Sequence, residues 1–260
     1  MSVFYEPIRN KIISTFKEQP LVPTRSGEYA PAIELYRGSA SIIDVIDDND
    51  LSLLTNQKTP LWTKNAQIDK HREIDFLDSL EIKKWGKNEL ENIFKPKSDE
   101  DRIKIETWIS NKPDHWLMKL YALLRNECVN IDRTLRIIRT TENDCVTVSE
   151  VYFLPDNEDD VPKNINFVKR DIYDVGDAEK RKEDARNFLS NIGVKTYSEN
   201  EKIRLRLKKL ADKYSISPPD VSETQYLDDI KEFCAFKNSK ELLFSTGSKM
   251  LFLDSLLILW

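Results

Sequence analysis

The most reactive side chains in this chain of 260 residues are two histidines and three cysteines. His71 and His115 each lack the neighbouring nucleophile motif that a Ser–His or Cys–His site would need. The cysteines are far apart, odd in number and without a Cys-x-x-Cys pair: Cys128, Cys145 and Cys234. Neither set has the ligand spacing of a zinc site. We therefore expect no catalytic residue and no metal site, and we expect reduced, partly buried thiols.

Acidic residues and glycines give no better candidate for chemistry. The acidic runs 47–50 and 156–160 lack the glycine and terminal glutamate of a calcium loop, so we interpret both as solvated loops. Carboxylate pairs such as Asp75 and Asp78 are expected by chance in so charged a chain. The six glycines are dispersed, and no Gly-x-Gly-x-x-Gly or Walker A sequence occurs. The sequence therefore predicts no nucleotide cofactor.

A basic stretch over residues 202–213 is the strongest local charge feature. Its candidate phosphate contacts are Arg204, Arg206, Lys208 and Lys209. We interpret the stretch as the solvated face of a packed helix. The alternative is contact with phosphates, which would make binding steeply dependent on salt.

Composition is that of an ordinary soluble protein, with 33% charged and 40% hydrophobic residues. The net charge of −5 gives no overall attraction to nucleic acid or to an anionic membrane. No basic start precedes an apolar core at the N-terminus, and no apolar run reaches the roughly 20 residues of a spanning helix. These features predict a cytoplasmic protein without a membrane segment.

The chain contains an internal repeat, which must position any functional residue. Residues 20–36 align with residues 136–152 without a gap, at a shift of 116 positions. Identical residues recur at three positions, as Thr24, Glu34 and Tyr36 in the first copy and Thr140, Glu150 and Tyr152 in the second. We expect these residues to be structural, with Thr closing a turn and Glu capping or pairing locally, rather than to line a shared peptide groove. Further along, residues 76–85 align with residues 188–197 at a shift of 112, so that Trp85 matches Tyr197.

Hydrophobic periodicity and turn residues predict the elements of each copy. A helix is expected over 5–18, then a hairpin turning at 25–28, and a second hairpin is expected to turn at Asn143-Asp144. A helical or loop segment is expected over 32–55, with short strands at 60–63 and 165–168. Further helices are predicted over 70–81, 87–95, 99–111, 114–128, 178–192, 199–214 and 222–245. Two capping boxes mark helix starts, Ser198 with Glu201 and Ser222 with Gln225.

These elements describe an α+β fold, dominated by helix, in which two modules follow one another. We expect a first module over 1–112, a second over 113–221, and a helix and strand over 222–260 that open a truncated third repeat. Because the chain ends within an apolar segment, we expect it to be part of a longer protein. Trp62, Trp85, Trp108 and Trp116 are expected to anchor the cores.

The repeat motif resembles one found in sacsin-like proteins, which carry an Hsp90-type ATP-binding domain followed by long modular regions. The resemblance rests on Leu21-Val22-Pro23-Thr24-x-x-Gly27-Glu28-Tyr29-x-Pro31 followed by Glu34. In the second copy Arg139 replaces Pro23 and Asn143 replaces Gly27. The stretches 116–121 and 188–194 are also similar to bacterial members. The glycine-rich segments of the ATPase site do not occur, so the resemblance implies downstream modules and supplies no catalytic residue.

Together these observations predict a non-enzymatic, chaperone-associated interaction region of a larger ATP-binding protein. Its expected partner is a protein or client, with an Hsp90-type ATPase domain as one candidate, and no cofactor is expected. The alternative is a nucleic-acid-associated module of a bacterial defence or restriction-type system, which would bind through residues 202–213. A weaker alternative is a nonfunctional fragment.

Overall fold

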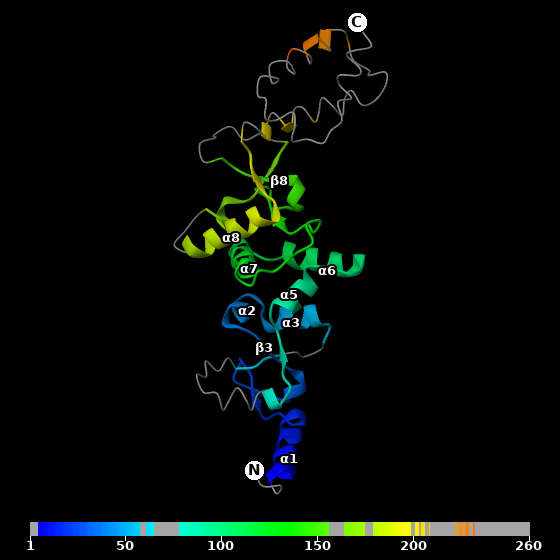
Figure 1. Ribbon diagram of the computed structural model, residues 1–260, viewed down its shortest axis with the longest axis vertical. Coiled ribbons are helices and arrows are strands. Elements are labelled where there is room, and N and C mark those ends of the chain that lie inside the picture. The colour runs from blue at the N-terminus through cyan, green and yellow to red at the C-terminus, as the bar shows by residue number, and fades with distance from the viewer. Residues whose placement is uncertain are drawn as a thin grey trace. The chain divides into compact units, whose positions relative to one another are not determined.

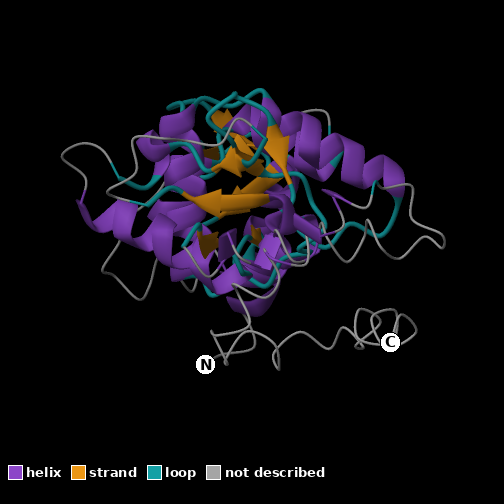
Figure 2. Ribbon diagram, turned by 90° about the horizontal axis from the view of Figure 1, so that it is seen from above, coloured by secondary structure: helices purple, strands orange, loops and turns teal. Residues whose placement is uncertain are grey.

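The computed structural model describes residues 5–57, 61–64, 78–155, 164–174 and 179–198, together with single residues between 201 and 231. The fold is α+β, and Figure 2 shows that its strands are short beside its helices. The chain forms two compact units, residues 1–151 with 165–194, and residues 152–164 with 195–260. The expected helices over 70–81, 199–214 and 222–245 fall largely outside the described residues. The expected strand at 250–260 falls wholly outside them. The division into modules at 112 and 221 stays a prediction.

The first repeat begins with a helix and a small hairpin, as the sequence predicts. The elements in chain order are α1 (Tyr5–Glu18), β1 (Val22–Pro23), β2 (Tyr29–Ala30), η1 (Ala32–Glu34) and β3 (Leu35–Arg37). Strands β1 and β2 are antiparallel, with Val22 opposite Ala30. Gly27 turns the chain at φ +90°, a conformation that glycine adopts without steric cost.

Strand β3 is the centre of a parallel sheet with the order β4-β3-β5. Its neighbours are β4 (Leu61–Trp62) and β5 (Lys83–Lys84). The predicted strand at 60–63 is confirmed by β4. The sequence analysis was wrong to give 32–55 only as helix or loop, because β3 lies within this range. A three-residue strand is too short to show alternation in the sequence, and pairing with strands far along the chain decides it.

Two short helices, α2 (Ala40–Val45) and α3 (Asp48–Thr55), follow β3. The Ser39 side chain caps α2, and the Asp47 side chain caps α3 by accepting from the Asp50 backbone N–H at 2.8 Å. The expectation of a solvated loop at 47–50 is therefore wrong. Aspartates are favoured at a helix start because their charge complements the unpaired N–H groups there.

Three further helices confirm the predictions from periodicity: α5 (Lys87–Ile93), α6 (Asp99–Ser110) and α7 (Asp114–Asn126). Ser98 caps α6 by accepting from the Asp101 backbone N–H at 3.1 Å. Helix α7 is strongly amphipathic and packs along α8 (Glu179–Ile192), where the Tyr121 and Phe188 rings stack at 5.7 Å. Both helices belong to the first compact unit.

The second repeat reproduces the hairpin, the short 3-10 helix and the three-stranded sheet of the first in the same order. Its elements are β6 (Ile138–Arg139), β7 (Cys145–Val146), η2 (Val148–Glu150), β8 (Val151–Phe153), β9 (Asn166–Phe167), η3 (Arg170–Ile172), α8 and β10 (Lys195–Thr196). The hairpin pairs Ile138 with Val146, and β8 pairs in parallel with β10 in a sheet of order β10-β8-β9. The predicted strand at 165–168 is confirmed by β9.

Matched backbone hydrogen bonds show that the two copies share one local fold. The Thr24 N–H donates to the Glu28 carbonyl and the Thr140 N–H to the Asp144 carbonyl, both at 2.8 Å. In the first copy the Arg25 N–H donates to the Trp62 carbonyl in β4, and in the second the Thr141 N–H donates to the Phe167 carbonyl in β9, at 2.9 Å in each case. Just after the last strand of each copy, the Trp85 N–H donates to the Arg37 carbonyl at 2.7 Å and the Tyr197 N–H donates to the Phe153 carbonyl at 3.0 Å. The repeat read from sequence is therefore also a repeat of hydrogen bonds.

Aromatic packing also recurs between the copies. Tyr36 and Trp85 pack edge to face at 6.4 Å in the first, and Tyr152 and Tyr197 do so at 5.8 Å in the second. The four tryptophans expected to anchor the cores are all buried: Trp62, Trp85, Trp108 and Trp116. Large aromatic side chains bury much apolar surface, which compensates for strands of only two or three residues.

Candidate functional site

Among the repeated motif residues, Thr24 and Glu150 make hydrogen bonds within the fold. The Thr24 hydroxyl donates to the Glu28 carbonyl at 3.1 Å, which closes the turn, and Glu150 accepts from the Thr147 backbone N–H at 3.0 Å. The Thr140 hydroxyl is buried and makes no hydrogen bond among the described residues, so the two copies differ at this point. Glu34 lies exposed in η1.

Arg139, which replaces Pro23, is buried and links the second hairpin to the end of α6. Its Nη2 donates to the carbonyls of Ser110 at 2.9 Å and Lys112 at 2.8 Å, which α6 leaves unpaired at its C-terminus. A guanidinium next to a helix C-terminus also complements the helix dipole. The substitution therefore joins the second copy to the helices that precede it.

The side chains that could do chemistry are not gathered together. His115 lies exposed in the first turn of α7, Cys128 is exposed and free, and Cys145 is free and half-buried. Burial raises the pKa of the Cys145 thiol. Within the described ranges, no three His, Cys, Asp or Glu side chains lie close enough to hold a metal ion. His71, Cys234 and the acidic run 156–160 lie outside those ranges.

The basic stretch is described only in part. Arg204 Nε donates to Glu201 Oε2 at 2.8 Å, and Glu201 also pairs with Lys195 at 3.2 Å. Lys208 is exposed, whereas Arg206 and Lys209 lie outside the described residues. The Ser198 and Ser222 hydroxyls accept from the backbone N–H groups three residues later, at 3.4 Å and 3.3 Å, as the predicted caps require. Phosphate contact stays a prediction.

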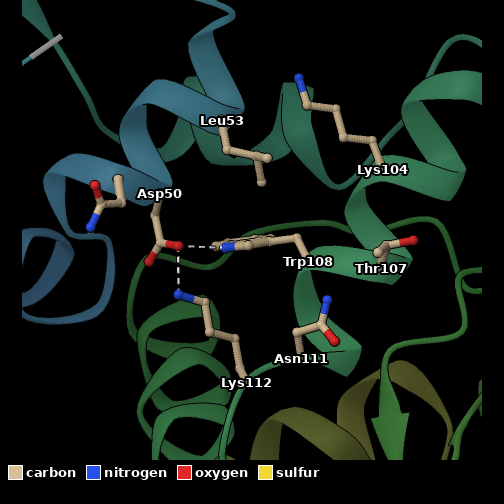
Figure 3. A pocket seen from close by; sticks show the side chains of 8 residues that line it. Asp50, Leu53, Lys104, Thr107, Trp108, Asn111 and Lys112 are labelled. Atoms are coloured by element: carbon tan, nitrogen blue, oxygen red, sulfur yellow. Dashed lines mark hydrogen bonds and ion pairs between the residues drawn. The ribbon is translucent and has the colours of Figure 1, made fainter. Parts of the chain in front are cut away.

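A pocket of ≈ 520 Å³ lies between α3 and α6 (Figure 3). Leu53, Lys104 and Thr107 line its rim, and the Trp108 indole forms part of its wall. The Lys104 ammonium donates to the Asn56 side chain. The pocket wall is mainly apolar, and its cationic groups already have partners within the protein.

The carboxylate of Asp50 closes one side of this pocket and is only 5% exposed. Its Oδ1 accepts from Trp108 Nε1 at 2.7 Å and from Lys112 Nζ at 2.5 Å, as Figure 3 shows. The Lys112 ammonium also lies 4.9 Å from the centre of the Trp116 ring. Asp50 Oδ2 is itself buried and has no hydrogen bond to any described residue. The group therefore ties α3 to α6 and α7 and is not open to a ligand.

Two more contacts join the α2 helix of the first copy to α7. Trp116 Nε1 donates to the Val45 carbonyl at 2.6 Å, which satisfies a carbonyl at the end of α2. Asp44 pairs with Lys119 at 3.1 Å and with Arg181 of α8 at 3.6 Å. Helix α7 is thus held on one side by α8 and on another by α2.

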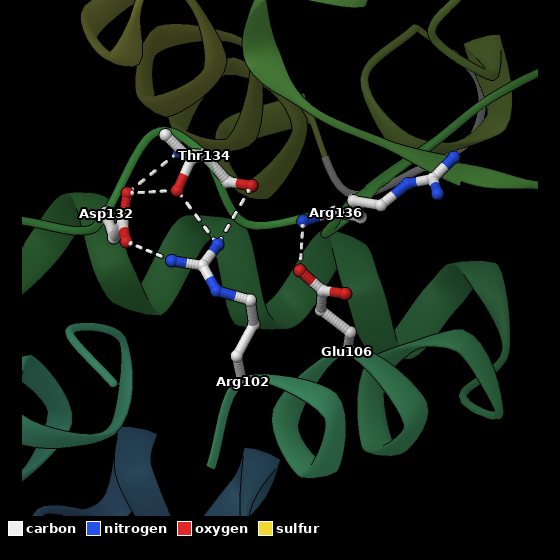
Figure 4. Close-up of polar contacts among 5 residues, drawn as sticks. All are labelled: Arg102, Glu106, Asp132, Thr134 and Arg136. Atoms are coloured by element: carbon white, nitrogen blue, oxygen red, sulfur yellow. Dashed lines mark hydrogen bonds and ion pairs between the residues drawn. The ribbon is translucent and has the colours of Figure 1, made fainter. Parts of the chain in front are cut away.

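A polar network fixes the connection between α7 and β6 (Figure 4). Arg102 of α6 donates to Asp132 at 3.0 Å and to the Thr134 hydroxyl at 2.8 Å, while Glu106 accepts from the Arg136 backbone N–H at 3.0 Å. Hydrogen bonds from the Thr134 backbone and hydroxyl hold the pKa of Asp132 below its ordinary value. The network therefore fixes the position of the chain between α7 and β6.

The feature that differs most between the copies is the exposure of their first helix. Helix α7 buries seven residues, whereas α1 buries none. The apolar contacts of helix α1 with the core run through the partly buried Ile13 and Phe16, which lie against a core cluster that includes Val22. Tyr5, Ile8 and Ile12 are 72%, 60% and 47% exposed. We call these three residues the α1 surface.

The same contrast continues after the helix. Leu21 is 41% exposed, whereas its counterpart Ile137 is fully buried. Ile33 is 72% exposed in η1, at a position where the second copy has Ser149. Figure 1 shows α1 extending away from the other helices of its unit. Ile8, Ile12, Ile13 and Phe16 share one face of the helix by their spacing, but nothing in the sequence indicates that half of this face is uncovered.

Comparisons with known protein families, curated proteins and solved structures find no match. Within the described part of the chain, no helix is long and apolar enough to span a membrane.

Proposed function

We propose that this chain is a protein-interaction region that binds a partner through the α1 surface. The observation that carries the proposal is the exposure of Tyr5, Ile8 and Ile12 on a helix whose counterpart in the second repeat is enclosed. Contiguous exposed apolar residues on a folded protein mark sites of interaction more often than isolated ones do.

The absence of a gathered set of reactive groups among the described residues fits a binding role. The polar groups that are buried, such as Asp50 and Arg139, contact other parts of the protein. The pocket between α3 and α6 presents a mainly apolar wall, and the Asp50 carboxylate at its side is paired with Lys112 and Trp108. These groups stabilise the frame on which the α1 surface is displayed.

The resemblance to sacsin-like proteins extends the proposal. On that basis we place the region in the cytoplasm, beside an Hsp90-type ATP-binding domain that would be its partner or would act on the same client. This part rests on the sequence motif alone. It is tested separately, by adding a purified Hsp90-type ATPase domain and measuring binding.

The test of the interaction surface compares the full chain with the double variant Ile8→Ser/Ile12→Ser. Ile103→Ser is the matched control, because Ile103 is 63% exposed on α6, outside the α1 surface. Each protein is immobilised, exposed to nuclease-treated extract of its source cells, and its bound proteins are quantified by mass spectrometry. We expect the double variant to lose bound proteins that the control retains.

Equal capture by all three proteins would contradict the proposal. Capture of nucleic acid without nuclease, lost on adding salt and on Arg204→Glu/Lys208→Glu substitution, would instead support the nucleic-acid alternative.

A further inference from the structure

We infer that the occupant of the α1 surface is an amphipathic helix of a partner protein that carries a carboxylate opposite Arg9. The inference rests on the proposed interaction function and specifies its partner. The α1 surface continues a helix face that already packs, because Ile13 and Phe16 contact the core on the next turns of the same helix. A helix laid along this face would therefore extend an existing helical contact.

Spacing along α1 matches a helical partner. Tyr5, Ile8 and Ile12 are separated by three and four residues, so they form one stripe along an α-helix. Helix α1 has 14 residues, and the stripe occupies its first two turns. Apolar residues at such spacing pack between those of a second helix.

Charge decides between a second copy of this chain and a different partner. Arg9 lies on the same face as the stripe, at about 40° round the helix from Tyr5. It is exposed, and among the described residues it makes no ion pair. In an antiparallel pair of α1 helices centred on the stripe, Arg9 lies close to the Arg9 of the second copy. In a parallel pair it lies on the side where the second copy presents Lys11. Like charges brought together in an apolar contact oppose association.

A carboxylate on the partner helix removes this penalty and compensates the Arg9 charge. Arginine forms directional, two-pronged hydrogen bonds with a carboxylate, so the pair would also set the register of the two helices. Lys11 lies about 120° round the helix from Tyr5, at the edge of the face. It is exposed like Arg9 and carries the same charge, so it serves as the matched control position.

The test is a selection from a displayed library of amphipathic helical peptides. All peptides share a Leu/Ile stripe, and the positions within and beside the stripe are randomised. The full-length protein, Arg9→Glu, Lys11→Glu and Ile8→Ser/Ile12→Ser are each used as bait, and circular dichroism checks that all are folded. We expect the unaltered protein to enrich Asp or Glu at one stripe-adjacent position. Arg9→Glu should weaken those peptides about tenfold or more and enrich Lys or Arg at that position. Lys11→Glu should have less than a threefold effect.

Other outcomes separate this inference from the proposed function. Peptides that require Ile8 and Ile12 but ignore the charge at residue 9 would overturn the carboxylate partner and keep the interaction surface. Peptides that bind the Ile8→Ser/Ile12→Ser variant equally well, or no enriched peptides, would overturn both. Sedimentation that shows a dimer for the unaltered protein and a monomer for Ile8→Ser/Ile12→Ser would identify a second copy as the occupant and overturn the inference.

Discussion

Replacing Lys112 by methionine is expected to destabilise the protein by about 3 kcal/mol, because a buried carboxylate loses its counter-charge. Asp50 is 5% exposed, and its Oδ1 accepts from Lys112 at 2.5 Å and from Trp108 at 2.7 Å. Its Oδ2 has no hydrogen bond within the described part of the chain, so no second partner there replaces the lysine. Methionine keeps most of the apolar stem beside the Trp116 ring, so the change isolates the charge from the packing.

The matched control is Lys119→Met, which breaks the pair with Asp44 at 3.1 Å. Asp44 is 45% exposed, so we expect this loss to cost less than about 1 kcal/mol. Equilibrium urea unfolding, followed by circular dichroism, measures both variants. In a thermal scan, Lys112→Met should lower the midpoint by roughly 6–12 °C.

A second variant tests the cause of the effect. Asp50→Asn/Lys112→Met removes both charges and leaves an amide oxygen that accepts from Trp108, so it should recover most of the lost stability. If Lys112→Met and Lys119→Met cost the same within about 0.5 kcal/mol, the Asp50 carboxylate is not a buried charge that depends on Lys112, and the reasoning fails.

Three smaller effects are expected elsewhere. Gly27→Ala should lower the free energy of unfolding in urea by about 1 kcal/mol, because the backbone stands at φ +90°. The cause is the backbone conformation, since an added Cβ meets no atom within 4 Å. Unchanged stability would contradict this. Iodoacetamide should modify the exposed Cys128 faster than Cys145, whose thiol pKa is raised by burial, and peptide mapping that found the opposite order would contradict the assigned exposures. The pKa of Asp132 in the folded protein lies below its ordinary value of 3.8, so the ionised carboxylate stabilises the fold at pH values above 3.8. This stabilisation is lost as the pH falls through the lowered pKa. Asp132→Asn should therefore lower the urea midpoint at pH 7 and make the fall of that midpoint below about pH 4 less steep. An unchanged fall would show that the Thr134 hydrogen bonds to Asp132 do not contribute to the pH dependence.

Local elements were largely predictable because local forces decide them. Helices α1, α6 and α7 follow from apolar spacing, and the Ser98 side chain caps the start of α6. Both hairpins follow from turn residues that tolerate positive φ, Gly27 in one copy and Asn143 in the other. The recurrence of one alignment in the sequence then implied that the same hydrogen bonds would recur.

Parallel strands were less predictable, because each is only two or three residues long. Strand β5 carries Lys83 and Lys84 and has no apolar alternation, yet it pairs with β3, whose residues lie 47 positions earlier in the chain (Tyr36 opposite Lys83). Strand β5 forms because β3 is available as its pairing partner, so the β-propensity of its own residues does not predict it. Asp50 shows the same limit, since an acidic run in sequence does not indicate that one carboxylate will meet a lysine and an indole from later helices.

The sequence by itself determined the α+β class, the repeated order of helix, hairpin and strands, and the apolar face of α1, since each depends on residues close together in the chain. Only the tertiary structure decided which part of that face is covered. Ile13 and Phe16 pack on the first core, while Tyr5, Ile8 and Ile12 extend beyond it, and the corresponding helix α7 is enclosed by α2 and α8. Burial depends on which distant elements reach a surface, and the same apolar pattern is therefore core in one copy and exposed in the other.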